Sequence, residues 1–109
     1  MNILIRKATL SDVPEIVRLL GDDDIARSRE KYHEEIPASY YAAFEVINTD
    51  KNNHLMVAEW NGQVVGTMQL TFITYLTYQG GKRAQIEGVR VDKSVRGHGI
   101  GKDRLKLHL

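Results

Sequence analysis

The sequence predicts an α/β fold in which a mixed, mostly antiparallel sheet is flanked by helices. Apolar residues follow strand-like or helix-like spacing in successive segments, in the order strand, helix, helix, strand, strand, strand and helix. Between the strand-like runs 54–60 and 63–73 lies Asn61-Gly62, a pair typical of a tight hairpin between antiparallel strands. We expect one domain, residues 1–109, because this length suits a single hydrophobic core.

The N-terminal half predicts one strand and two helices. Residues 3–8 form an apolar strand candidate. In the segment that follows, four apolar residues recur at i, i+3, i+4 and i+7, on one face of a helix: Val13, Ile16, Val17 and Leu20. Either Thr9 or Ser11 can cap this helix, and Gly21 is a natural end. Residues 39–48 predict a second helix with Tyr40, Ala43, Phe44 and Ile47 on one side.

A glycine-rich turn follows a strand-like run near the end of the chain. Residues 86–92 are rich in β-branched side chains, which predicts a strand. Residues 96–102 contain three glycines, whose missing side chains allow a ligand to approach the backbone closely. A helix that opens after such a turn offers unpaired N–H groups and a dipole that favour an anion, above all phosphate. Arg96 and Lys102 flank the turn and add two positive charges.

Two common phosphate-binding loops do not fit this turn. A P-loop requires G-x-x-x-x-G-K-[ST], but Gly101-Lys102 is followed by Asp103, and Arg96 stands where the first glycine would be. A dinucleotide-binding fingerprint requires G-x-G-x-x-G with an acid about twenty residues later. The spacing here is G-x-G-x-G, and the sequence ends at Leu109, before that acid.

The turn resembles the acyl-CoA loop of the GNAT family of N-acetyltransferases, which reads [RQ]-x-x-G-x-[GA]. Every fixed position matches in Arg96-Gly97-His98-Gly99-Ile100-Gly101, and the run 86–92 is similar to the fourth strand of that family. The resemblance covers nearly the whole chain. It implies the acyl-CoA N-acyltransferase fold and an enzyme that transfers an acetyl group from acetyl-CoA to a primary amine of a small molecule.

The resemblance also implies which residues hold the donor. Pantetheine is a chain of amides that can pair with a strand edge as an added strand would, here through the backbone of Val89 and Val91. The loop would bind the phosphates through its N–H groups. The expected acetyl-CoA contacts are therefore Val89, Val91, Arg96, Gly97, His98, Gly99, Ile100, Gly101 and Lys102.

Glu87 is our candidate for the general base and the N–H of Val89 for the oxyanion contact. Amine acetylation requires loss of a proton, directly or through water, and passes through a tetrahedral oxyanion. An unbroken strand would place Glu87 on the same face as Val89 and Val91, and Gly88 could host a bulge that re-aims it. The alternative is an ion pair between Glu87 and a neighbour such as Arg83.

The end of the chain departs from the family. Its thiol-protonating tyrosine lies in a later helix that has no counterpart here, and Tyr75 or Tyr78 would have to substitute. In residues 105–109, apolar and polar side chains alternate strictly, which favours a strand. We therefore expect a domain that is truncated, internally deleted or lacking a segment, and an inactive acyl-CoA-binding module is the alternative function. An uncovered fourth-strand edge also predicts a homo-oligomer.

Composition narrows the class further. With 42% hydrophobic and 27% charged residues, the chain is typical of an ordinary globular domain. It has no cysteine, no membrane-length apolar run and no signal peptide, which favours a cytoplasmic protein without disulfides. Residues 82–109 hold eight basic against three acidic side chains, which suits an anionic ligand or a solvated basic face. Nucleic acid is not expected, because no Phe, Tyr or Trp accompanies this basic region.

Metal is not expected either. His33 has no partner at metal-ligand spacing. It lies in residues 22–37, a polar segment that in the family often shapes the acceptor pocket and that otherwise reads as a solvated loop.

Overall fold

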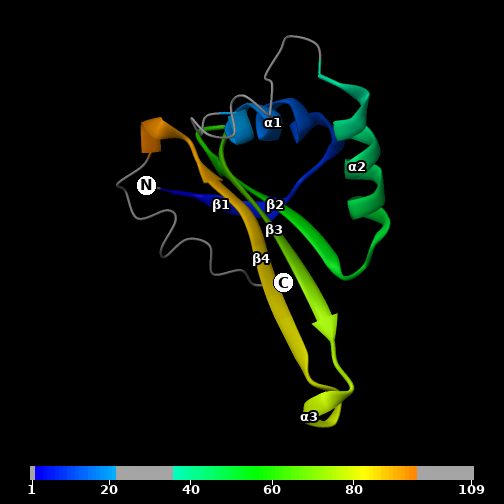
Figure 1. Ribbon diagram of the computed structural model, residues 1–109. Helices are drawn as coiled ribbons and strands as arrows, with labels where there is room; N and C mark the ends of the chain where they lie inside the picture. Colours follow the sequence, from blue (N-terminus) through cyan, green and yellow to red (C-terminus); the bar gives the residue numbers. More distant parts are fainter. Residues whose placement is uncertain (1, 22–35, 96–109) are drawn as a thin grey trace.

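A computed structural model describes residues 2–21 and 36–95 (Figure 1). The elements in chain order are β1 (Leu4–Lys7), the 3-10 turn η1 (Leu10–Asp12), α1 (Val13–Gly21), α2 (Ala38–Thr49), β2 (Asn53–Trp60), β3 (Gln63–Thr74), α3 (Thr77–Gly80), β4 (Lys82–Val91) and the 3-10 turn η2 (Lys93–Val95). The predicted class, helices on a mostly antiparallel sheet, is confirmed. None of the described helices is long and apolar enough to cross a membrane.

The described strands form one sheet in the order β1-β2-β3-β4, and every neighbouring pair is antiparallel. The predicted hairpin is confirmed, since Asn61 and Gly62 have φ values of 52° and 77°, as a tight left-handed turn requires. β3 and β4 continue beyond the other two strands as a two-stranded arm that ends in α3 (Figure 1).

Both long helices lie on one face of the sheet (Figure 1), which we call the helical face. Four apolar side chains of α1 are buried there: Val13, Ile16, Val17 and Leu19. Leu19 was not part of the predicted stripe, whereas the predicted Leu20 is only partly buried. From α2, Phe44 is buried and Tyr40 packs beside it. Each fully buried side chain of this size contributes about 1.5–3 kcal/mol.

The opposite face carries the residues that alternate with this core. Met56, Met68 and Leu70 form one buried cluster, and Ala58, Val65 and Val95 form another. Period-2 alternation explains the division, because Val57 packs under the helices while its neighbours Met56 and Ala58 point away. The sheet is therefore apolar on both faces over its central part.

The turn into α1 is fixed by a carboxylate. Asp12 accepts hydrogen bonds from Arg6 Nη1 at 2.7 Å and Nη2 at 3.0 Å, and from the Thr9 N–H at 2.7 Å. Thr9, rather than Ser11, stands at the N-cap of this first turn. Arg6 also pairs with Glu59 of β2 at 3.0 Å. The Arg6 hydrogen bonds are the main reason that the pKa of Asp12 falls from 3.8 to about 2.

We predict that this carboxylate stabilises the fold in a pH-dependent way. Because the folded pKa of Asp12 is depressed, its contribution is present above about pH 4 and is lost as the pH falls toward 2. Asp12→Asn should lower the free energy of unfolding at pH 7 by about 2 kcal/mol and flatten the acid limb of the stability profile. Urea unfolding between pH 2 and 7 measures both.

Glu15→Gln is the matched control. Glu15 also pairs with an arginine, Arg18, but its side chain is 47% exposed and lies only one helical turn away. Its loss should cost less than about 1 kcal/mol. Equal losses for the two variants would contradict the role given to Asp12.

Candidate active site

A bulge interrupts β4 at the predicted position. Glu87 pairs with Gln69 and Arg90 pairs with Thr67, so two residues of β4 face the single residue Met68 of β3. One of the two, Gly88, has a φ of 65°, in the left-handed region that glycine adopts without strain. The prediction that Gly88 hosts a bulge is therefore confirmed.

The bulge decides which residues of β4 share a face with Glu87. Its partner Gln69 is in turn paired with Leu55, which packs against the helical core, so Glu87 lies on the helical face. Val91 is on the opposite face, where it packs with Ala58. The prediction from an unbroken strand, that Glu87 and Val91 share a face, is wrong because the extra residue inverts the alternation.

The Glu87 carboxylate is exposed and accepts a hydrogen bond from Gln85 Nε2. The alternative ion pair with Arg83 is not formed, since the Arg83 guanidinium lies over the ring of Tyr75, 5.2 Å from its centre. Among residues 2–21 and 36–95, Glu87 forms no ion pair.

A polar strip connects Glu87 to a small apolar cavity. Gln69 Nε2 donates to Asn53 Oδ1 at 2.8 Å, and Thr71 Oγ1 donates to the same oxygen at 3.2 Å. Gln69 also lines a cavity of about 170 Å³ between α1, α2 and the sheet, whose other walls include Tyr40 and Phe44. The site thus offers one carboxylate, several amide and hydroxyl groups, and an apolar recess.

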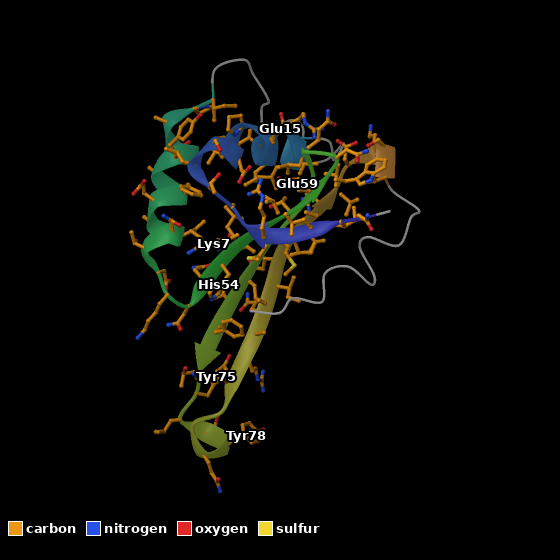
Figure 2. The ribbon with its side chains drawn as sticks, turned by 180° about the vertical axis from the view of Figure 1, so that it is seen from behind. Lys7, Glu15, His54, Glu59, Tyr75 and Tyr78 are labelled. Carbon is orange, nitrogen blue, oxygen red and sulfur yellow. The ribbon has the colours of Figure 1, made fainter. Side chains whose placement is uncertain are left out.

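The two tyrosines considered as proton donors lie elsewhere. Tyr75 and Tyr78 are at the tip of the arm (Figure 2), and Tyr78 is 83% exposed. Glu87 follows Lys82, the first residue of β4, by five positions, which is roughly 17 Å of strand from this tip. Neither tyrosine is brought to the bulge in this structure.

The end of β4 is tied to α1. Asp92 Oδ2 accepts a hydrogen bond from Arg18 Nη1 at 2.7 Å, while Oδ1 accepts from the Ser94 N–H at 2.9 Å and from its hydroxyl at 2.8 Å. The Ser94 N–H is the main cause, helped by Arg18, of the lowered pKa of Asp92. The Asp92 N–H bonds to Val65 O at 2.8 Å, so strand alternation directs the amide groups of Val91 to the outer side of β4.

The predicted loop begins directly after this anchored turn. Its residues lie outside the described part of the chain: Arg96, Gly97, His98, Gly99, Ile100, Gly101 and Lys102. The same holds for the segment 22–35 with His33, and for the predicted strand 105–109. Among residues 2–21 and 36–95, no group of three His, Cys, Asp or Glu side chains could hold a metal ion.

Comparison with known proteins identifies the class. Residues 15–106 match the model of the acetyltransferase (GNAT) family. A crystal structure described as a transcriptional regulator from Bacillus halodurans has 49% sequence identity and a TM-score of 0.87, covering 92% of this chain and 67% of its own. Among curated proteins, none matches.

Two acetyltransferase structures share the fold at lower identity. Glucosamine-6-phosphate N-acetyltransferase from Arabidopsis thaliana has 24% identity and a TM-score of 0.71, with 93% of this chain and 67% of that one covered. A Clostridium acetobutylicum structure with acetyl-CoA, described as a predicted acetyltransferase, has 21% identity and a TM-score of 0.66, with 95% and 69% covered.

These matches show a domain with the acyl-CoA N-acyltransferase fold. The chain belongs to the GNAT acetyltransferase family, as its glycine-rich loop predicted. It spans about two thirds of the length of the structures that it matches.

We predict that the bulge requires glycine for conformational reasons alone. A Cβ at Gly88 would meet nothing within 4 Å, so Gly88→Ala costs only the left-handed backbone strain, about 1–2 kcal/mol. It should also shift the backbone resonances of Glu87 and Arg90, because the strand relieves the strain by changing the bulge. Chemical denaturation and amide NMR spectra measure the two effects.

Gly62→Ala is the matched control, with a φ of 77° and equally open space. It should lose similar stability in the hairpin turn and leave the resonances of Glu87 in place. A Gly88→Ala protein as stable as its parent would show that the left-handed conformation is not needed.

Proposed function

We propose that this protein transfers an acetyl group from acetyl-CoA to the primary amine of a small molecule. Family membership supports acetyl transfer in general. The observation that carries the finer proposal is the geometry around the bulge. Glu87 lies on the helical face, and Val89 belongs to β4, the edge strand of the described sheet. The Arabidopsis relative is named for a small amine acceptor, and the Clostridium structure was solved with acetyl-CoA.

Glu87 acts as the general base in this proposal. It takes a proton from the acceptor amine, directly or through one water, and the nitrogen lone pair then attacks the thioester carbonyl carbon. The carbonyl oxygen becomes an oxyanion that accepts a hydrogen bond from the Val89 N–H. When the carbonyl re-forms, the carbon–sulfur bond breaks and the thiolate of CoA leaves. The nitrogen gives its extra proton to solvent, and the thiolate gains one from solvent or a neighbouring acid.

Donor binding depends on β4 and the loop after it. The outer amide groups of Val89 and Val91 pair with pantetheine, and the loop 96–102 binds the phosphates through its N–H groups and two basic side chains. The link from Arg18 to Asp92 supports this arrangement, because it fixes the strand end from which the loop departs.

The role of Glu87 predicts a loss of turnover without a loss of donor affinity. Glu87→Gln keeps the size and the hydrogen bond from Gln85 but cannot take a proton, so the maximal rate should fall roughly 100-fold or more. The affinity for CoA, measured by calorimetry, should stay within about twofold of the parent. Glu45→Gln, an exposed acid on α2, is the control. Unchanged turnover at saturating amine and acetyl-CoA would remove Glu87 from the mechanism.

The loop assignment predicts a loss of donor binding. Gly99→Glu places a bulky anion where phosphate should approach the backbone, so CoA binding should disappear from calorimetric titrations at micromolar protein concentration. Ala42→Glu introduces the same side chain on the exposed side of α2 and should bind CoA normally. Tight CoA binding by Gly99→Glu would mean that the donor site lies elsewhere.

The second candidate function is an acyl-CoA-binding module without turnover. It is favoured by the position of Tyr75 and Tyr78 at the tip of the arm, away from Glu87. The Bacillus halodurans relative, described as a transcriptional regulator, gives a further reason to test it. CoA binding without acetylation of any amine would select this alternative.

We also propose a homo-oligomer in the cytoplasm. β4 is the last strand of the described sheet, and along it Ile86 and Val89 are 55% and 38% exposed. Before the residues proposed to pair with pantetheine, such an edge favours pairing with another strand, here that of a second copy. The absence of cysteine from the sequence supports a reducing compartment.

A further inference from the structure

A second ionisable side chain shares the helical face with Glu87. Arg90 is paired with Thr67, and Thr67 with Val57, which is buried under the helices. Glu87 is paired with Gln69, two residues along β3 from Thr67. Residues two apart on a strand point the same way and lie about 7 Å apart. The bulge therefore places an acidic and a basic residue on the same face of β4, at positions that lie next to each other on that face.

Arg90 differs from Arg6 and Arg18, the other described arginines outside the arm. Arg6 pairs with Asp12 and Glu59, and Arg18 pairs with Glu15 and Asp92. By contrast, Arg90 has no carboxylate within ion-pair distance in the described part of the chain. Its Nη1 donates to the carbonyl oxygen of Val89 at 2.9 Å, and its Nε is buried without a hydrogen-bond partner.

An unsatisfied guanidinium donor at a ligand site points to an anionic group. Leaving a buried donor without a partner is unfavourable, and a charged donor more so. The planar fork of arginine matches the two oxygens of a carboxylate or phosphate better than any other side chain. An acceptor whose amine lies at Glu87 would bring its next few atoms toward Arg90.

We propose that the acceptor is a primary amine that carries an anionic carboxylate or phosphate group within a few bonds of its nitrogen. Glu87 receives the amine and Arg90 receives the anionic group. Arg90 is thus a specificity-determining residue, and the inference rests on the proposed acetyl transfer to a small amine. The partly exposed polar strip of Gln69 and Thr71 lies beside them and could receive the body of the acceptor.

The experiment compares amines that differ only in the anionic group. β-Alanine is tested against propylamine, and 2-aminoethyl phosphate against ethanolamine, with acetyl-CoA saturating. For the wild-type protein, kcat/KM should be roughly 10- to 100-fold higher for the anionic member of at least one pair, the usual worth of a charge-assisted hydrogen bond. The pair that shows the larger ratio tells whether the group is a carboxylate or a phosphate.

Three variants assign the preference to one side chain. Arg90→Met should remove the preference, and Arg90→Lys should restore part of it, because lysine keeps the charge and loses the fork. Arg83→Met is the control: it removes the same charge from the same strand, where Arg83 contacts Tyr75 instead. It should keep the full ratio. The KM for acetyl-CoA should be the same in all four proteins.

A binding measurement separates this inference from the proposed function. With CoA present, β-alanine or 2-aminoethyl phosphate should shift the NMR resonance of the Arg90 Nε–H group, and propylamine should not. If the resonance shifts but no probe is acetylated, acetyl transfer fails and the anion site stands. The inference is overturned if no anionic probe moves the resonance, if the probes of each pair react equally, or if Arg90→Met raises the KM for acetyl-CoA instead.

Discussion

The arrangement of the site depends on one extra residue in β4. Before the bulge, Glu87 points to the helical face, and after it Arg90 returns to that face while Val91 points away. In a regular strand, residues 87 and 91 would share a face and residue 90 would oppose them. Glu87 and Arg90 can therefore share the helical face only because β4 holds an extra residue at Gly88, in a left-handed conformation.

Two arginine clusters hold the frame around this strand. Arg6 joins β1 to the turn before α1 and to β2, and Arg18 joins α1 to the end of β4. Both line a polar cavity of about 570 Å³, together with Asp12, Glu15 and Asp92. Because each of these arginines already has two carboxylates, the cavity is not suited to an anion. What the Arg18–Asp92 ion pair does is tie the end of β4 to α1.

Local patterns predicted the features that depend on neighbouring residues. The Asn61-Gly62 turn, the apolar stripe of α1 and the bulge at Gly88 all follow from short-range rules. The first half of β4, from Lys82, was missed because its side chains are exposed on both faces and show no apolar alternation. α3 was missed too, since Tyr78 and Gln79 adopt left-handed conformations that their side chains do not favour.

The site residues that depend on long-range pairing could not be predicted in this way. The partnership of Arg18 with Asp92 joins segments with no shared local pattern. The position of Arg90 could have been found only by counting through the bulge, because on a regular strand it would face away from Glu87. Knowing that Gly88 hosts a bulge is thus not enough, and the change in alternation must be carried to every later residue.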